Sequence, residues 1–247
     1  MKKYDMTTEK ITHGDRTLSR IRALTSFGFI KSGELGGYIE KELNLSQAGN
    51  AWVSGNAWVS GDARVYGNAW VSGDARVGNA EVYGNAWVYD NAEVSGNARV
   101  SGDAEVSGNA RVYDNARVSG NAWVYGNAWV SGNAEVYGNA WVYDNAGVSG
   151  NARVYGNAWV SGNAWVYGNA EVYAKNHLIY VGPIGSRSGF TTFFRTKDNK
   201  ICVSCGCFTG DIDEFEAAVK ETHAGTKHEK TYMLAIEIAK AQIEMER

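Results

Sequence analysis

The chain has 247 residues, with 30 glycines, a single proline and a formal net charge of −3 at pH 7. Glycine with so little proline excludes a collagen, the slight negative charge argues against a general nucleic-acid coat, and a hydrophobic content of 44% is too high for a disordered chain. The sequence lacks a long apolar run and a signal-peptide core, and its three cysteines do not make a disulfide framework. We therefore expect a soluble cytoplasmic protein with no membrane partner.

Residues 1–49 predict a small β-structured cap. Residues 17–24 alternate like a strand, residues 32–39 predict a turn followed by a strand, and residues 44–47 lead into the next segment. That next segment is a repeat whose first strands would expose unpaired edges, so we interpret residues 1–49 as the structure that covers them.

Residues 50–173 are built from one short repeat. The unit (Asn/Asp)-Ala-x-Val recurs 21 times, and its valine returns every sixth residue except between Val77 and Val82, where the unit has lost the residue after its valine. Glycine precedes the Asn/Asp-Ala pair in 18 units. In the other three units the preceding residue is an aspartate: Asp90, Asp114 and Asp144. Alanine and valine two residues apart share a face of a strand but not of a helix, and Gly-Asn suits a tight corner. The pattern predicts stacked short strands with alanine and valine inward and hydrogen-bonded asparagines at the corners.

The run Val-Ser-Gly-Asn-Ala-Trp at residues 53–58, with its successors, resembles the hexapeptide-repeat proteins. That resemblance implies an all-β, left-handed parallel β-helix with three strands in each coil, so the 21 units would make about seven coils. Strands stacked about 4.8 Å apart would form a prism roughly 30 Å long.

The outward residues before the valines sort into three columns, taking every third unit, which we call the first, second and third faces. The first face holds six of the nine tryptophans, and the third face is wholly charged. A soluble monomer rarely leaves such an apolar strip open, so we expect a homotrimer with the first face at its interface. The alternatives are a stacking platform for sugars or single-stranded bases, and plain exposure with the rings shielding one another. The predicted interface residues are Trp52, Trp70, Trp87, Trp123, Trp141 and Trp159.

Residues 174–247 leave the repeat and predict a small α+β domain. Residues 177–181, 190–196 and 200–204 predict three strands. The spacing of Asp211 and Glu214 is typical of a capping box that starts a helix, and a second helix is predicted from about Glu229.

Two stretches of this domain, Gly-Ser-Arg at residues 185–187 and Cys-Gly-Cys-Phe at residues 205–208, resemble the C-terminal module of uncharacterised phage and prophage proteins. The run from Leu18 to Asn50 also resembles the start of bacterial and prophage hexapeptide-repeat proteins that are labelled transferases from their fold. The resemblance implies a location in the cytoplasm of a bacterial host cell, leaves association with a virion open, and carries no settled activity.

A glycine-rich turn with basic and hydroxyl side chains around it is the predicted ligand site. Backbone N–H groups and positive charge can together hold a phosphate-bearing or nucleotide-like ligand, and an ordinary strand connection is the alternative. The predicted ligand-binding residues are Gly185, Ser186, Arg187, Thr191, Thr192, Arg195 and Lys197. We expect both arginines to be exposed.

Candidate catalytic and metal-binding residues are few. Many hexapeptide-repeat proteins are acyltransferases with a histidine base, and a related type binds zinc through three histidines on its coils, but none of the four histidines here lies in a coil. His177, beside the last coil, is the candidate base of an acyltransferase. The three cysteines and His223 could supply zinc ligands, although buried small thiols are more common. We predict no metal, no cofactor and no catalytic residue.

Two function classes remain. In the first, a non-catalytic trimeric scaffold presents its C-terminal domain to an anionic small ligand or to a host protein, with interference in host defence as the role that the phage resemblance suggests. In the second, the chain is an acyltransferase with its site near the last coil. Nucleic acid is not expected as a partner, because residues 51–173 carry an excess of acidic side chains.

Overall fold

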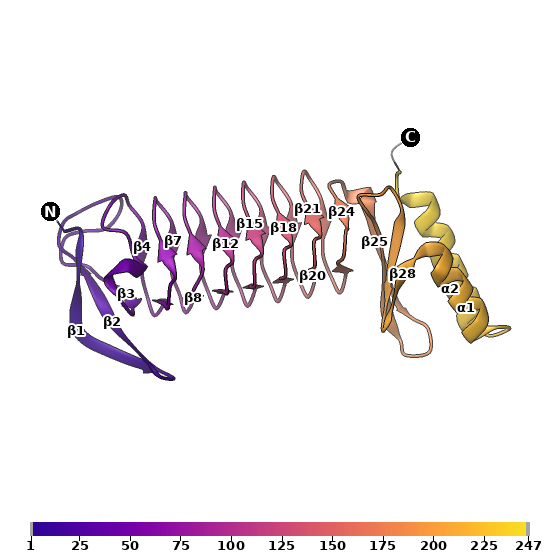
Figure 1. Ribbon diagram of the computed structural model, residues 1–247, viewed down its shortest axis with the longest axis horizontal. Coiled ribbons are helices and arrows are strands. Elements are labelled where there is room, and N and C mark those ends of the chain that lie inside the picture. The colour runs from indigo at the N-terminus through magenta and orange to yellow at the C-terminus, as the bar shows by residue number, and fades with distance from the viewer. Residues whose placement is uncertain (1, 246–247) are drawn as a thin grey trace.

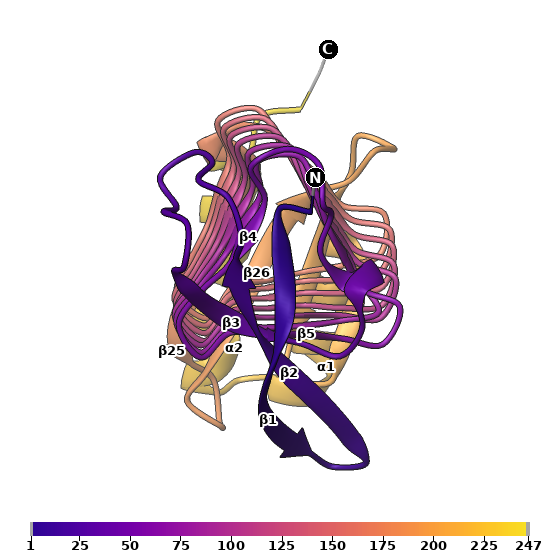
Figure 2. The same ribbon diagram turned by 90° about the vertical axis from the view of Figure 1, so that its left-hand side faces the viewer.

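A computed structural model describes residues 2–245. The chain forms a rod in three parts: an N-terminal β structure, a solenoid of stacked coils, and a sheet with two helices at the far end (Figure 1). Seen from the N-terminal end, the coils superimpose as a three-sided prism (Figure 2).

The solenoid has three parallel sheets, one for each predicted face, so the predicted β-helix architecture of seven three-strand coils is confirmed. The first face is β4 (Trp52–Val53), β7 (Trp70–Val71), β10 (Trp87–Val88), β13 (Glu105–Val106), β16 (Trp123–Val124), β19 (Trp141–Val142) and β22 (Trp159–Val160). The second is β5 (Trp58–Ser60), β8 (Arg76–Gly78), β11 (Glu93–Ser95), β14 (Arg111–Val112), β17 (Trp129–Val130), β20 (Gly147–Val148) and β23 (Trp165–Val166). The third is β6 (Arg64–Val65), β9 (Glu81–Val82), β12 (Arg99–Val100), β15 (Arg117–Val118), β18 (Glu135–Val136), β21 (Arg153–Val154) and β24 (Glu171–Val172).

The solenoid core consists of the valine and alanine of every unit, as the alternation predicts. From Ala51 to Val172 these side chains are buried in one continuous cluster. Burial of each valine contributes about 1.5–3 kcal/mol, and the small alanine beside it lets the three sheets approach closely around a narrow axis.

The corners depend on a left-handed backbone at the residue before each Asn or Asp. Glycine adopts it in most units, with φ of +69° at Gly120, and Asp90, Asp114 and Asp144 adopt it at +58° to +59°. A left-handed backbone is strained at a residue with a side chain. At each of these aspartates a hydrogen bond offsets that strain, because the carboxylate accepts the N–H of the glycine one coil further on. The corner asparagines form the expected ladders, in which side-chain amides donate to the Asn or Asp one coil further on at 2.8–3.3 Å.

The residue missing from the short unit is not the one that the sequence predicts. Gly78 pairs with Ser60 and so occupies the position directly after the valine. Asn79 then takes the left-handed corner position, with φ of +58°. The missing residue is therefore the corner asparagine, and the ladder of that corner is interrupted between Asp62 and Asn97. Asn79 partly restores it, because its side-chain oxygen accepts the N–H of Asp62 at 2.9 Å.

The N-terminal residues complete one more turn of the solenoid. β1 (Tyr4–His13) and β2 (Arg16–Ala23) form an antiparallel hairpin, and β3 (Leu35–Ile39) pairs with β2 on one side and in parallel with β5 on the other. After the 3-10 turn η1 (Glu42–Asn44), Leu45 forms a parallel bridge to Val65. The strands predicted within residues 17–24 and 32–39 are confirmed. The strand β1 was not predicted, because its side chains are mostly exposed on both faces and show no alternation.

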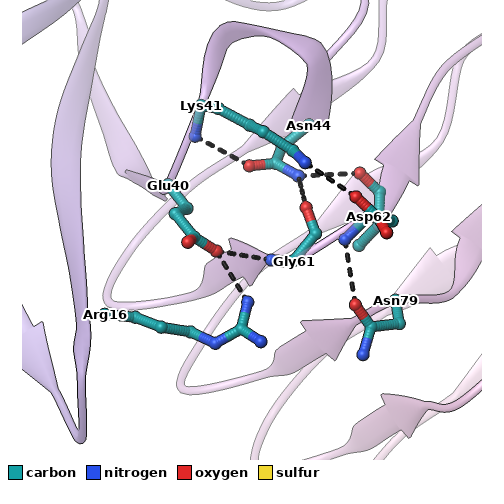
Figure 3. A network of polar contacts seen from close by, with 8 residues as sticks. Arg16, Glu40, Lys41, Asn44, Gly61, Asp62 and Asn79 are labelled. Atoms are coloured by element: carbon teal, nitrogen blue, oxygen red, sulfur yellow. Dashed lines mark hydrogen bonds and ion pairs between the residues drawn. The ribbon is translucent and has the colours of Figure 1, made fainter.

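A polar network joins this cap to the short corner (Figure 3). The carboxylate of Glu40 accepts hydrogen bonds from Arg16 and from the N–H of Gly61. The buried amide of Asn44 donates to the carbonyls of Gly61 and Ala63 at 3.0 and 2.8 Å. These contacts satisfy edge groups of the first coil, which an uncapped solenoid would leave unpaired.

The C-terminal residues form an antiparallel sheet covered by two helices. After η2 (Lys175–His177), the sheet runs in the order β25 (Leu178–Ile184), β26 (Gly189–Arg195), β27 (Ile201–Cys205) and β28 (Phe208–Asp211). Asp211 caps α1 (Ile212–His223) with the predicted capping box, and α2 (Lys227–Gln242) follows. The strand β28 was not predicted.

This sheet closes the end of the solenoid. Successive residues of β26 face opposite ways: Phe194 joins the solenoid core, while Phe193 joins the core between the sheet and the helices. The N–H of Trp165 donates to the hydroxyl of Thr192 at 3.1 Å, and the N–H of Lys197 donates to the carbonyl of Asn169 at 3.1 Å. The C-terminal sheet is thus hydrogen-bonded to the last coil rather than tethered by a linker (Figure 1).

No helix among residues 2–245 is long and apolar enough to cross a membrane.

Candidate functional site

The C-terminal domain contains a cleft of about 290 Å³ between the turns of its sheet and the two helices. Its walls are mostly apolar, with Phe190, Phe208 and Phe215 among them, and polar groups lie at its rim. A few polar groups on an apolar wall are typical of small-molecule sites.

The turn between β25 and β26 places Arg187 at this rim. Gly185 adopts φ of +75°, and a side chain there would collide with the hydroxyl of Tyr232 from α2, so only glycine lets the turn approach the helix. The exposed guanidinium of Arg187 forms no ion pair with any carboxylate that the structure describes. Its positive charge is therefore available to a ligand.

A hydrogen-bonded chain of three side chains lies beside the cleft. The hydroxyl of Thr191 donates to the sulfur of Cys205 at 3.1 Å, and that sulfur lies 3.7 Å from the hydroxyl of Tyr232. Burial, and to a smaller extent the hydrogen bond with Cys205, raise the pKa of Tyr232 to about 12. Tyr232 thus stays protonated at neutral pH and offers a neutral hydroxyl to the cleft.

The predicted ligand residues do not all meet in this cleft. Ser186 and Arg187 line it, and Gly185 lies under Tyr232 at its edge. Thr192 and Lys197, by contrast, lie where the C-terminal sheet is hydrogen-bonded to the last coil, a contact that we call the joint. The first group lies in the turn before β26, whereas Thr192 lies within β26 and Lys197 follows it.

The expected exposure of Arg195 is wrong. The side chain is 2% exposed and lies against Tyr173 of the last coil, 5.0 Å from the ring centroid. Its Nε donates to the side-chain oxygen of Asn199 at 3.3 Å. Arg195 is therefore part of the joint, and its removal would disturb packing between the two parts.

The cysteines do not converge on one point. Cys202 packs against the solenoid core and Cys205 against the C-terminal core, because residues three apart on a strand face opposite ways. Within residues 2–245, no group of three or more His, Cys, Asp or Glu side chains has an arrangement that could hold a metal ion. The zinc alternative thus has no supporting geometry.

The candidate acyltransferase base is also out of reach of a substrate. His177 is 4% exposed, and its ring packs edge-on against Tyr173 with centroids 4.1 Å apart. A general base needs contact with the group whose proton it removes, so no observation favours His177 in that role.

Comparison with known protein families matches the solenoid to one repeat type. The model described as YdcK beta solenoid repeat matches residues 57–73, 63–79, 110–126, 116–132 and 146–162. These stretches of the solenoid are similar to that repeat. A search of curated proteins finds no match.

The tryptophan column of the solenoid follows the predicted order but divides into separate environments. Trp123, Trp141 and Trp159 stack face to face, with ring centroids 5.1 and 5.4 Å apart. The ammonium group of Lys175 lies 3.4 Å from the centroid of Trp159 and closes one end of the stack. Inside the stack the rings cover one another's faces, and the outer face of Trp123 lies toward Glu105 in the preceding coil.

One residue of the predicted interface is excluded. Trp52 is 0% exposed, because Phe27 packs edge-on against it at 5.4 Å and Tyr4 at 6.4 Å. A side chain buried by its own cap cannot contact a second chain, so Trp52 belongs to the fold rather than to an interface.

The apolar wall of the cleft was missed in the sequence. Phe208 lies on the unpredicted strand β28, and Phe215 and Tyr232 lie on different helices, with Phe215 5.0 Å from Phe208 and 5.6 Å from Tyr232. The available signal was the aromatic residue on the inward stripe of each predicted helix, which is as typical of an ordinary core as of a ligand pocket.

Proposed function

We propose that this YdcK-type solenoid is a non-catalytic rod that holds its C-terminal domain in a fixed position, and that the cleft of this domain binds an anionic ligand with an apolar body. The observation that carries the proposal is the packed and hydrogen-bonded contact between the C-terminal sheet and the last coil. Hydrogen bonds from Trp165 and Lys197, together with Phe194 in the solenoid core, prevent the domain from swinging on the rod.

The place of the cleft supports the same function. Its walls come from α1, α2 and the turns of the sheet, so it opens among the elements that lie beyond the sheet from the solenoid. A ligand or partner at the end of the rod would meet this cleft without obstruction from the coils.

The chemistry of the walls indicates the class of ligand. Arg187 can form charge-assisted hydrogen bonds with a phosphate or carboxylate, and the phenylalanine rings can cover a flat apolar group such as a nucleobase. The neutral hydroxyl of Tyr232 adds a directional contact. A nucleotide-like anion combines these features.

Calorimetry with AMP, cyclic AMP and glucose 6-phosphate tests this proposal on the full chain. We expect one of the nucleotides to bind, and the Arg187→Ala variant to bind it about 10–100-fold more weakly. Lys197→Ala is the matched control, because it removes a cation at the joint, outside the cleft. Absence of heat with all three compounds, or equal weakening in the two variants, would contradict the proposal.

The proposal includes association of copies through the part of the first face that runs from Trp123 to Trp159. Trp123 and Trp159, at the two ends of the stack, are each 39% exposed to solvent. Burial of these rings against a second copy would remove apolar surface from water. A trimer would carry several identical clefts at one end.

A further inference from the structure

A groove of about 540 Å³ lies near the other end of the rod, where a loop of the cap meets the first face. It lies outside the C-terminal cleft and shares no residue with it. Its lining residues are Gly28, Phe29, Asn50, Asn68, Trp70, Asn85 and Trp87.

Phe29 is fixed in position yet contributes little to the fold. Phe27 and Ile30 hydrogen-bond to each other at 3.1 and 2.8 Å, which makes Gly28 and Phe29 the tip of a tight turn. Both flanking side chains pack inward: Ile30 is buried and Phe27 contacts Trp52. The phenyl ring at the tip is nevertheless 93% exposed. The turn fixes the backbone of Phe29, and an apolar ring presented to water in this way gives the fold no benefit.

Trp70 and Trp87 lie outside the stack that runs from Trp123 to Trp159. Their strands are neighbours, with Trp87 in register with Trp70. Within residues 2–245, however, no aromatic ring stacks on either indole, in contrast to the stack from Trp123 to Trp159. Trp87 is 53% exposed, the largest exposed fraction among the tryptophans of the first face. Its ring is therefore available to a flat apolar surface.

A row of amides runs beside these rings. The side chain of Asn50 donates to Asn68 at 3.1 Å, Asn68 donates to Asn85 at 3.0 Å, and Asn85 donates to Asp103 at 2.8 Å. A carboxamide has two N–H groups and an oxygen with two lone pairs. The ladder uses one N–H of each asparagine, so each of these exposed amides keeps a donor and accepting capacity toward the groove.

The groove has no ionisable side chain in its lining. A phosphate or a nucleic-acid backbone would find no cation there, and their affinity depends on such cations. The lining instead suits a neutral ligand with one apolar face and a rim of hydroxyl groups. A pyranose has this form, because its axial C–H groups make a flat apolar face and its hydroxyls project around the ring.

We propose that the Phe29–Trp87 groove binds a neutral oligosaccharide, with sugar rings against Trp87 and Phe29 and their hydroxyls on the row of asparagines. The turn that carries Phe29 closes one side of the groove, and the coils supply the other. The volume of the groove falls in the range of about 300–1,000 Å³ that is usual for ligand sites.

Saturation-transfer NMR and calorimetry on the full chain test this site with maltotetraose, cellotetraose and tetra-N-acetylchitotetraose. We expect at least one of these sugars to bind, Trp87→Ala to weaken its binding more than 10-fold, and Phe29→Ala to weaken it about 3–10-fold. Phe29 is so exposed that its variant keeps the fold, which removes misfolding as a cause.

Two matched variants complete the test. Trp165→Ala removes an exposed tryptophan from the second face and should leave sugar binding unchanged, as should Arg187→Ala in the other cleft. The proposal is overturned if none of the three sugars binds, or if Trp165→Ala weakens binding as much as Trp87→Ala. It is also overturned if Trp87→Ala lowers the mass in light scattering, because the groove would then be a contact between copies.

Discussion

The inward valine is the residue on which each coil depends. Val112 lies in the middle of the solenoid, at 0% exposure, with Val94 and Val130 as its neighbours in the coils on either side. We expect Val112→Asp to lower the free energy of unfolding by roughly 4 kcal/mol or more, because a lone buried carboxylate has no partner there. Thermal unfolding followed by circular dichroism measures the change.

The adjacent outward residue provides the control for this substitution. Arg111→Asp introduces the same side chain on the exposed side of the same strand, so its effect should stay within about 1 kcal/mol. If Val112→Asp proves as stable as Arg111→Asp, the assignment of valine to the interior is wrong.

Lys3 links stability to pH. Its ammonium group is buried, donates to the carbonyl of Ala51 at 2.8 Å, and loses enough hydration that burial lowers the pKa of Lys3 from 10.5 to about 8. Between these two pH values the unfolded chain holds a proton that the folded chain has released. The contribution of Lys3 to the free energy of unfolding should therefore rise with pH, by roughly 2 kcal/mol from pH 8 to pH 10.

Comparison of wild type with Lys3→Met isolates this contribution. Urea unfolding at several pH values gives the difference in free energy of unfolding between wild type and variant, and this difference should rise from pH 8 to pH 10. Burial raises the pKa of Cys202 and Tyr4, so these groups lower stability as pH rises, but they do so equally in both proteins. A difference that stays constant or falls between these pH values would contradict the prediction.

At the scale of the elements, the corners show what a coil requires of its sequence. A Cβ atom at Gly120 would lie 3.0 Å from the nitrogen of Gly138 in the next coil, and the backbone there is left-handed. We expect Gly120→Ala to destabilise the solenoid by about 1–2 kcal/mol. Gly120→Asp should cost roughly 1 kcal/mol less, because its carboxylate can accept the N–H of Gly138 as Asp114 accepts that of Gly132.

Gly168→Ala separates backbone strain from contact with the next coil. Gly168 has the same left-handed backbone, with φ of +66°, but a Cβ atom there would meet nothing within 4 Å. Differential scanning calorimetry of the three variants should therefore rank Gly120→Ala as the least stable. Equal stability of the alanine and aspartate variants at residue 120 would show that the corner hydrogen bond contributes nothing.

The same elements explain how far the sequence predicts the structure. Within the repeat every position has the same neighbours in each coil, so a local period determines faces, columns and core together. The position of the missing corner residue could not be predicted, because Gly78 and Asn79 can each follow a valine, and only pairing with the next coil decides between them.

Outside the repeat, burial depends on contacts between distant segments. Trp52 shares its pattern with Trp70, but Phe27 from the cap covers only Trp52. Arg195 has the sequence context of an exposed strand end, yet Tyr173 of the last coil covers it. For the candidate cleft, the turn with Arg187 was predicted, whereas its aromatic wall arises from β28 and two helices that meet only in the fold.

At the scale of the whole molecule, the caps turn a repeat of small units into a rod with two different ends. The N-terminal hairpin extends one solenoid sheet, so that ten strands run in a single sheet from β1 to β23. At the other end, Phe194 fills the last coil. The two proposed sites lie near opposite ends, and a rigid solenoid would keep their separation constant.

The last prediction concerns the association of copies of the chain through the first face. We expect the Trp123→Lys/Trp159→Lys variant to run as a monomer in light scattering and the wild type as a trimer, because the change removes aromatic area and adds like charge at the proposed contact. The control is Trp129→Lys/Trp165→Lys, which changes two exposed tryptophans of the second face, also two coils apart and 6.3 Å between ring centroids. Both variants should keep the far-ultraviolet spectrum of the wild type, since the altered side chains point away from the core. A monomeric wild type, or a mass that falls equally in both variants, would exclude the first face as the interface.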